Sequence, residues 1–269
     1  MTEQDWDSAA DPMRRVGRRV EFHAAIGSTN DRARAALVEP PGDGLAVVAD
    51  LQTAGRGRRG RTWASPAGAN LMVSVGVRPR LSAARAGLLG IAAALAVRDA
   101  SAELLPANDL RVKWPNDVVT VDGRKVAGLL VETAISGDAV AEAIIGMGIN
   151  VNWPVAEMPA DLQGRAASLC DLAGGPRDRV ELLRRLMEHL DRELAALERG
   201  ESPLERLATV SALDGRRVVI DTGDGQQEGT ALGLTDDGQL LLETNGGRQT
   251  LAIGEVVSVR TEMPAGAAP

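Results

Sequence analysis

Residues 52–63 read Gln-Thr-Ala-Gly-Arg-Gly-Arg-Arg-Gly-Arg-Thr-Trp, so three glycines alternate with four arginines before a tryptophan. Glycine permits positive φ angles and leaves backbone N–H groups accessible to a ligand. Arginine carries a permanent charge on a planar fork that matches carboxylates and phosphates. Apolar runs at 45–49 and 71–75 flank this stretch, which is typical of a loop between two buried strands. We therefore interpret 52–63, called the arginine loop below, as a mobile loop that closes over an anionic small molecule.

The composition of the chain argues against a nucleic-acid-binding arm, which is the alternative interpretation of an Arg/Gly-rich loop. The 269 residues carry a formal net charge of −7, whereas such proteins usually spread positive charge over a whole face. A single cysteine excludes a disulfide framework and the common zinc patterns. No apolar run approaches the roughly 18 residues of a membrane span, and no signal-like leader opens the chain. We expect a cytoplasmic protein without membrane contact.

Two lysines, Lys113 and Lys125, stand among 30 basic residues that are otherwise arginine. The Ala-, Gly- and Arg-rich composition suggests a coding bias that replaces lysine wherever arginine serves equally well. An ammonium group is a compact point charge, whereas guanidinium is a wide plane. We therefore expect both lysines to occupy positions where arginine does not function.

Hydrophobic periodicity predicts a large α/β unit followed by a small β-barrel. In the large unit we expect strands at 18–22, 45–49, 70–78, 110–113, 118–121, 125–132 and 139–146, and helices at 32–38, 82–100, 176–198 and 201–213. Short strands separated by Gly/Asp turns predict an SH3-like barrel, at 218–221, 228–234, 240–243, 251–253 and 256–259. The expected divisions are a disordered tail at 1–15, a catalytic domain at 16–211, the barrel at 212–262 and a tail at 263–269.

Smaller features leave alternatives open. Ser28 or Thr29 is a plain N-cap of the following helix, or else contributes to a polar ligand site at its N-terminus. The glycines of 146–148 permit close approach by a ligand ring at a strand end, or else form a glycine bulge. We expect His23 and His189 to lack catalytic partners, with His189 on the surface.

Five ordered motifs resemble those of the biotin–protein ligases. They are residues 27–30 (GSTN), 52–61 (QTAGRGRRGR), 113–117 (KWPND), 124–128 (RKVAG) and 146–152 (GMGINVN). The resemblance implies an α/β (α+β) fold: a mixed sheet flanked by helices, related to class II aminoacyl-tRNA synthetases, with a C-terminal SH3-like barrel. It also implies an ATP-dependent ligase. Such enzymes join biotin to ATP as biotinyl-5′-AMP and transfer the biotinyl group to one lysine of a biotin carboxyl carrier protein domain.

The resemblance assigns roles to individual residues. Three cations are the implied catalytic groups: Lys125, Arg58 and Lys113. The implied biotin-binding residues are Ser28, Thr29, Asn30, Gln52, Gly55, Arg56, Gly57, Arg58, Lys125 and Gly128. The implied ATP-binding residues are Arg59, Arg61, Trp63, Lys113, Asn116 and Asn150. Asp117 is the implied Mg²⁺ ligand. No protein nucleophile is needed, because the reaction requires positioned positive charge and excluded water.

A lipoate–protein ligase of the same fold is the nearest alternative, although the arginine loop favours biotin. Bifunctional biotin–protein ligases also carry an N-terminal winged helix-turn-helix. The ~20 residues that precede the first motif are too few for such a module. We therefore expect no sequence-specific DNA binding, and a monomer or weak homodimer.

Overall fold

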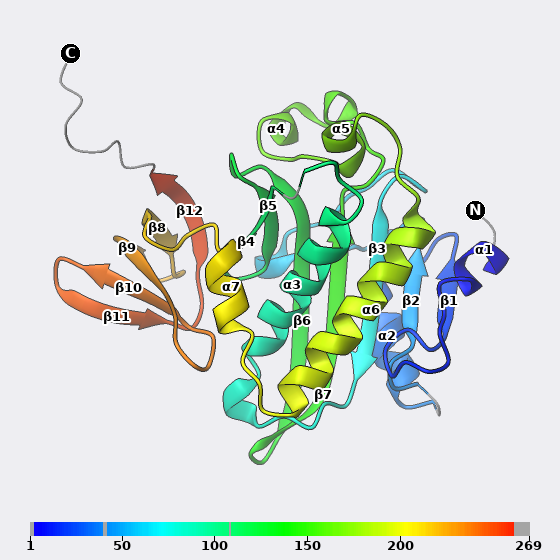
Figure 1. Cartoon of the computed structure of the whole chain (residues 1–269), viewed down its shortest axis with the longest axis horizontal. Helices are drawn as coiled ribbons and strands as arrows, with labels where there is room; N and C mark the ends of the chain where they lie inside the picture. Colours follow the sequence, from blue (N-terminus) through cyan, green and yellow to red (C-terminus); the bar gives the residue numbers. More distant parts are fainter. Residues whose placement is uncertain (1–2, 40–41, 108, 261–269) are drawn as a thin grey trace.

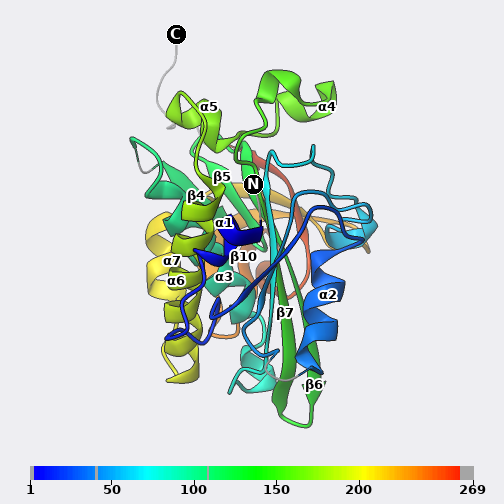
Figure 2. The same ribbon diagram turned by 90° about the vertical axis from the view of Figure 1, so that its right-hand side faces the viewer.

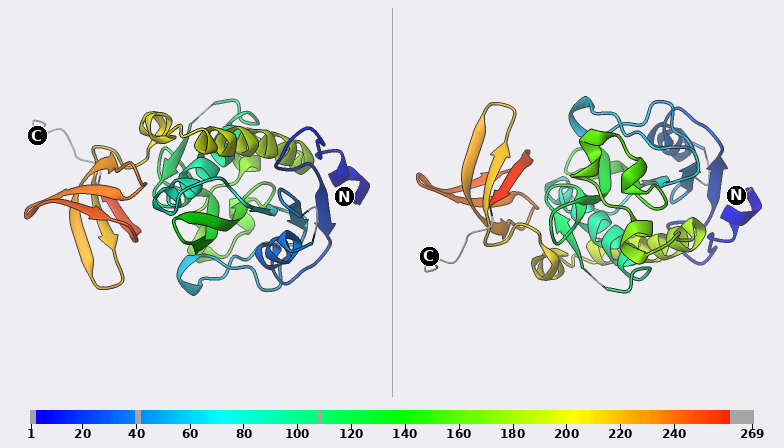
Figure 3. Two further views of the ribbon diagram at one scale, coloured as in Figure 1. Left: turned by 90° about the horizontal axis from the view of Figure 1, so that it is seen from below. Right: turned by 90° about the horizontal axis from the view of Figure 1, so that it is seen from above.

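A computed structural model of the chain describes residues 3–39, 42–107 and 109–260. A large mixed sheet flanked by helices forms most of the molecule, and a smaller antiparallel sheet lies at one end (Figure 1). Figure 3 shows this smaller sheet and the N-terminal helix at opposite ends of the larger unit. The expected α/β fold with a small C-terminal β domain is confirmed.

The large sheet has seven strands in the order β1-β2-β3-β7-β6-β5-β4. They are β1 (Val20–His23), β2 (Ala46–Ala49), β3 (Leu71–Val77), β4 (Leu110–Lys113), β5 (Asp117–Thr120), β6 (Lys125–Ser136) and β7 (Ala139–Ile149). The pair β1–β2 is parallel, and the remaining neighbours are antiparallel. Strands β2 and β3 are buried along their whole length, which explains why both read as continuous apolar runs.

Helices cover both faces of this sheet (Figure 2). The helices of the described residues are α1 (Glu3–Asp7), α2 (Thr29–Leu37), α3 (Leu88–Ala102), α4 (Ala160–Gln163), α5 (Leu169–Ala173), α6 (Arg179–Glu198) and α7 (Leu204–Val210). Helix α3 packs between the sheet and α6, so it is apolar around most of its circumference. Helix α2 packs on the opposite face, against β2 and β3. The helix expected at 82–100 begins only at Leu88, because a separate 3-10 turn occupies Ala83–Arg85.

The smaller sheet has the strand order β11-β10-β9-β8-β12. Its strands are β8 (Arg217–Asp221), β9 (Gln226–Leu234), β10 (Leu240–Thr244), β11 (Gly247–Leu251) and β12 (Glu255–Arg260). The strand expected at 251–253 is wrong: β11 begins at Gly247, because a two-residue turn pairs Thr244 directly with Gly247. Residues 217–260, called the barrel below, bury an apolar core that includes Trp114 from the larger unit. The Trp114 indole Nε1 also donates to the carbonyl of Gly238 at 3.2 Å.

The expectation of a disordered start at 1–15 is wrong for the described residues from 3 onward. Trp6 in α1 is fully buried, and its ring stacks on Phe22 with the centroids 5.8 Å apart. The guanidinium of Arg179 lies 5.3 Å from the same ring and pairs with Asp50. One aromatic residue in a polar segment gives no periodic signal, although its burial anchors the whole segment.

Trp6→Ala is expected to lower the free energy of unfolding by about 3 kcal/mol, since a buried aromatic ring is replaced by a cavity. Denaturant unfolding followed by circular dichroism measures this difference. Met13→Ala is the control from the same segment, because the Met13 side chain is 92% exposed. Equal stabilities of the two variants would contradict a structural role for the N-terminal helix.

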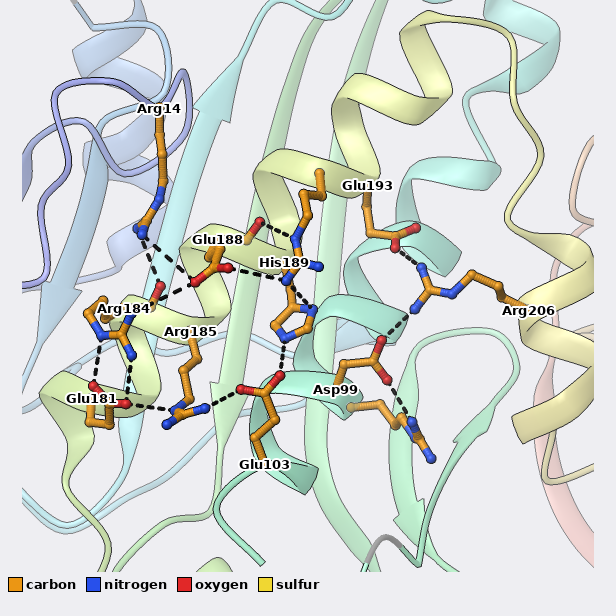
Figure 4. Close-up of polar contacts among 12 residues, drawn as sticks. Arg14, Asp99, Glu103, Glu181, Arg184, Arg185, Glu188, His189, Glu193 and Arg206 are labelled. Atoms are coloured by element: carbon orange, nitrogen blue, oxygen red, sulfur yellow. Dashed lines mark hydrogen bonds and ion pairs between the residues drawn. The ribbon is translucent and has the colours of Figure 1, made fainter.

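A network of charged side chains covers the outer surface of α6 (Figure 4). His189 Nε2 lies 2.8 Å from Glu103 Oε1, so this histidine, expected on the surface without a catalytic partner, has an acidic partner at the outer surface of α6. The guanidinium of Arg184 lowers the pKa of Glu181 to about 2, despite the opposing effect of burial. Arg206 in α7 pairs with Glu193 in α6 and Asp99 in α3. These contacts attach the helix that precedes the barrel to the larger unit.

Candidate functional site

A cavity of about 750 Å³ opens where the arginine loop, the ends of β5–β7 and the barrel strand β12 meet. It is the size of a typical small-molecule site. Residues from all five motifs line it. The predicted site residues that line it are Ser28, Thr29, Asn30, Gln52, Arg56, Gly57, Arg58, Arg61, Trp63, Lys113, Asn116, Asp117, Lys125, Gly128 and Asn150. Gly55 and Arg59 do not line it.

The arginine loop contacts the barrel through ion pairs. Arg59 Nη1 lies 3.0 Å from Asp221 Oδ2, and Arg61 Nη2 lies 2.7 Å from Glu255 Oε2. Arg59 takes a left-handed backbone conformation with φ of 54°. The Arg59 side chain is therefore engaged outside the cavity. The prediction that Arg59 binds ATP phosphates has no support in this geometry.

Arg58 and Lys113 are cations without a carboxylate partner in the described part of the chain. Arg58 Nη1 donates to Asn116 Oδ1 and to the Gly254 carbonyl, both at 3.3 Å. Burial lowers the pKa of the Arg58 guanidinium, and the charge of Arg59 lowers it further. Burial also lowers the pKa of the Lys113 ammonium, against the opposing attraction of Asp117. Two partly desolvated cations that line one cavity form a candidate site for an anion.

Lys125 occupies a tightly defined position beside these cations. Its Nζ lies 2.6 Å from Asp117 Oδ1 and 5.6 Å from the ring centroid of Trp63. A Cβ on Gly128 would lie 2.7 Å from the Lys125 Nζ and 3.0 Å from Cζ3 of Trp63, so a larger residue there would displace the ammonium from this position. The ammonium of Lys125 thus lies between the carboxylate of Asp117, the ring of Trp63 and the backbone of Gly128.

The glycines at the end of β7 accommodate a ring of the protein itself. A Cβ on Gly148 would lie 2.6 Å from Cε2 of Trp63. The β3–β7 and β6–β7 registers run unbroken through 146–148, so the bulge interpretation is wrong. The close approach expected of a ligand ring is made by the Trp63 indole, which forms one wall of the cavity.

The N-terminus of α2 forms a polar end of the cavity. Ser28 caps the helix in an extended conformation, but its side chain makes no capping hydrogen bond. Thr29 N donates to Gln52 Oε1 at 2.8 Å, which fixes the orientation of the glutamine amide. This hydroxyl and amide cluster therefore faces the cavity, as the ligand-site interpretation requires.

The polar groups of three predicted site residues are bound to other groups of the protein. Arg56 pairs with Asp31 through both of its terminal nitrogens, at 2.8 and 2.7 Å. Asn150 Nδ2 donates to the carbonyls of Lys125 and Ala167, at 3.3 and 3.2 Å. The Asn116 Nδ2 donates to a backbone carbonyl of β6 at 2.7 Å. These three side chains form part of the cavity wall, and the groups named here are already bound within the protein.

Sequence reasoning missed Arg165, which is exposed and lines the cavity. Its carbonyl accepts from Lys125 N at 2.7 Å, which places it beside the catalytic candidates. No described side chain pairs with its guanidinium. The surrounding polar loop carries no motif or periodicity that distinguishes this arginine from the others in the chain.

The described residues contain no cluster of three or more His, Cys, Asp or Glu side chains that could hold a metal ion. Asp117, the predicted Mg²⁺ ligand, is engaged by Lys125 at 2.6 Å. An ammonium in contact with the carboxylate competes with a divalent cation for the same oxygens. Asp117 therefore does not fit a Mg²⁺ ligand in this arrangement.

Among the helices of the described ranges, none has both the length and the apolar composition of a membrane span.

Comparisons with known proteins agree with the motifs. Residues 23–150 match the model of the Biotin/lipoate A/B protein ligase family, and residues 215–258 match the Biotin protein ligase C terminal domain. The biotin--[acetyl-CoA-carboxylase] ligase of Mycobacterium tuberculosis is 35% identical over 249 residues, which cover 90% of each chain. The chain belongs to the biotin/lipoate protein ligase family.

Two further members of the biotin/lipoate protein ligase family extend the comparison. The bifunctional ligase/repressor BirA of Bacillus subtilis is 34% identical over 86% of this chain and 71% of its own length. The biotin protein ligase of Aquifex aeolicus, solved in complex with biotin and ATP, matches with a TM-score of 0.72 and 29% identity. That match covers 90% of this chain and 99% of the Aquifex chain. Both units of the ligase-family fold are therefore present here.

Lys113→Met is expected to raise the melting temperature by roughly 2 °C. A gain of about 1 kcal/mol in the free energy of unfolding gives a shift of this order for a chain of this length. The pKa of Lys113 is lower in the folded chain, so the unfolded chain binds more protons between the two pKa values. Wild-type stability should therefore rise with pH through that window, and the variant should lose this rise. Differential scanning fluorimetry across pH measures both effects. A lower melting temperature for the variant would contradict a desolvated cation.

Proposed function

We propose that this protein is a biotin–protein ligase that activates biotin with ATP and biotinylates a lysine of a biotin carboxyl carrier protein domain. The observation that carries this proposal is the pairing of two features in one cavity. A polar end formed by Ser28, Thr29 and Gln52 suits a ureido ring. A cationic end formed by Arg58, Lys113 and Lys125 suits a carboxylate and a phosphate.

In the first half-reaction a biotin carboxylate oxygen attacks the α-phosphorus of ATP, and the bond from that phosphorus to the bridging oxygen breaks. Biotinyl-5′-AMP forms and pyrophosphate leaves. Both reactants are anions, so catalysis depends on cations that are already positioned and desolvated. Lys125 faces the carboxylate, with Asp117 orienting its ammonium. Lys113 and Arg58 stabilise the charge on the α-phosphate.

In the second half-reaction the amine of a carrier lysine attacks the acyl carbon of the adenylate. The amide bond forms, AMP leaves with the electron pair of the acyl–oxygen bond, and the amine loses a proton. The arginine loop excludes water until the lysine arrives, because hydrolysis would otherwise consume the mixed anhydride. Trp63, Arg61 and Arg165 line the same cavity, and we expect them to contact the nucleotide part of the adenylate. Mg²⁺ would accompany the nucleotide phosphates and neutralise part of their charge.

A polar end with fixed donors favours biotin over lipoate, whose ring has no ureido group. Nucleic-acid binding through the arginine loop is disfavoured, because Arg56, Arg59 and Arg61 are paired with carboxylates. We further propose a cytoplasmic enzyme, monomeric or weakly dimeric, without sequence-specific DNA binding.

The test is an incubation with ATP, Mg²⁺, biotin and an unmodified carrier domain, followed by intact mass measurement. We expect one biotinyl group on one carrier lysine, and pyrophosphate release that depends on biotin. A parallel incubation with lipoate should leave the carrier unchanged. Lipoylation in place of biotinylation, or no modification by either acid, would overturn the proposal.

A further inference from the structure

A line of buried hydrogen bonds connects the polar end of the cavity to a carboxylate outside it. Asn30 Nδ2 donates to Glu132 Oε2 at 2.7 Å, and Ser74 Oγ donates to Asn30 Oδ1 at 2.6 Å. Ser74 Oγ also lies 2.7 Å from Thr29 Oγ1. The four residues belong to β6, α2 and β3, and Ser74 is fully buried.

The carboxylate at one end fixes the direction of the whole line. Glu132 pairs with Arg34 at 3.1 Å, and an ionised carboxylate only accepts hydrogen bonds. Asn30 must therefore turn its NH₂ group toward Glu132 and its oxygen toward Ser74. The flipped amide would set two oxygens against each other at 2.7 Å. Ser74 accordingly gives its one proton to Asn30.

Thr29 is left as an acceptor toward the cavity. Its hydroxyl proton has two acceptors within reach, Ser74 Oγ at 2.7 Å and Gln52 Oε1 at 3.0 Å. Whichever takes it, only lone pairs remain for a ligand. With Ser74 donating to Asn30, the shorter contact is bridged when Thr29 donates to Ser74, and in that arrangement the bond dipoles align from Thr29 to Glu132. Aligned bonds polarise one another, which strengthens Thr29 Oγ1 as an acceptor.

Gln52 supplies the complementary group. Its Oε1 accepts from Thr29 N at 2.8 Å, so its NH₂ donors stay available. The polar end thus offers an acceptor next to donors, which matches an N–H beside a carbonyl. We propose that Ser74 and Glu132 are positioning residues that orient Thr29 to accept from the ureido N–H of biotin. This inference rests on the proposed function, because it names the group that the same cavity recognises.

The test is the biotin and ATP dependence of pyrophosphate release by Ser74→Ala and Glu132→Gln. In Ser74→Ala we expect the KM for biotin to rise about tenfold, which corresponds to about 1.4 kcal/mol. The uncharged Glu132→Gln should raise it about threefold, because charge-assisted bonds are about twice as strong as neutral ones. The KM for ATP and kcat should stay within about twofold of wild type, since neither residue lies near the cationic end.

Two matched controls separate this role from a general structural one. Ser101→Ala removes another fully buried hydroxyl, one that lacks a partner among the described residues. Glu142→Gln neutralises a carboxylate on β7 that pairs with Arg78 at 2.9 Å. The side chains of Glu132 and Glu142 are 34% and 33% exposed, so the two glutamine variants match in exposure, and Glu132 in addition lies 3.9 Å from Arg56 of the arginine loop. Both controls should keep the wild-type KM for biotin.

Each outcome decides between the two proposals. An unchanged KM for biotin in folded Ser74→Ala, or a parallel loss of kcat and ATP affinity, would overturn the positioning role alone. If Ser74→Ala does not fold, the surface variant Glu132→Gln still decides, because a KM equal to that of Glu142→Gln contradicts the proposal. A wild-type protein without biotin-dependent pyrophosphate release would overturn the proposed function itself.

Discussion

Lys125→Arg is expected to slow adenylate formation about 100- to 1,000-fold, the usual loss when a positioned charge is misplaced in an active site. The ammonium of Lys125 lies 2.6 Å from Asp117 and against the bare backbone of Gly128. Trp63 closes the other side, 5.6 Å from the nitrogen. A guanidinium is wider and planar, so it would push the charge away from the biotin carboxylate.

The adjacent residue provides the reciprocal control. Arg124 pairs with Asp122 at 2.7 Å and has a 38% exposed side chain. Arg124→Lys should therefore change the rate less than about threefold, as surface ion pairs contribute little. Biotin-dependent pyrophosphate release at saturating substrates measures both variants, with melting temperature as the check on folding. If folded Lys125→Arg keeps the wild-type rate, the scarcity of lysine reflects composition alone.

Arg58→Gly is expected to release the activated intermediate, raising the labelling of bystander proteins about 100-fold. Arg58 extends from the arginine loop into the cavity and has no carboxylate partner in the described structure, so its charge is available to the acyl phosphate. Hydrogen bonds to charged groups contribute about 1.5–3 kcal/mol, and each ~1.4 kcal/mol lost raises the open population about tenfold. Lys125 and Lys113 remain, so adenylation itself should continue.

Arg59→Gly separates loss of charge in the cavity from loosening of the loop. Arg59 is the next residue, but its side chain reaches Asp221 in the barrel and does not line the cavity. Glycine also suits the positive φ at this position. After incubation with biotin, ATP and albumin, we expect about tenfold less albumin labelling from Arg59→Gly than from Arg58→Gly. Albumin labelling by Arg58→Gly at the wild-type level, with carrier labelling intact, would show that the loop does not retain the intermediate.

Features encoded locally in the sequence could be predicted. The apolar run at 45–49 corresponds to the buried β2, and the lysine of 113–117 ends β4 at the cavity. Each motif is recognisable from residue types that stand next to one another in the sequence. Most of the predicted site residues therefore converge on one cavity, although their individual roles as ligand contacts remain predictions.

Features that depend on distant partners could not be predicted. Arg59 and Asp221 are 162 residues apart, so nothing local distinguishes a barrel-binding arginine from a phosphate-binding one. Gly148 is required by the indole of Trp63, and Asn30 is oriented by Glu132 on another element. Trp6 lies in a polar segment whose composition suggests disorder, and only the tertiary structure reveals its buried ring.

The position of Trp114 means that neither unit of this chain could easily be replaced by the corresponding unit of another ligase. Its backbone belongs to the 113–117 motif at the cavity, whereas its indole completes the barrel core and donates to Gly238. A chain cut after residue 211 would expose that ring to water and remove the carboxylates that hold Arg59 and Arg61. A barrel grafted from another ligase would therefore need a matching tryptophan pocket and two acidic residues in register with the loop. The cavity and the barrel would in this sense have to be replaced together, as one interlocking piece.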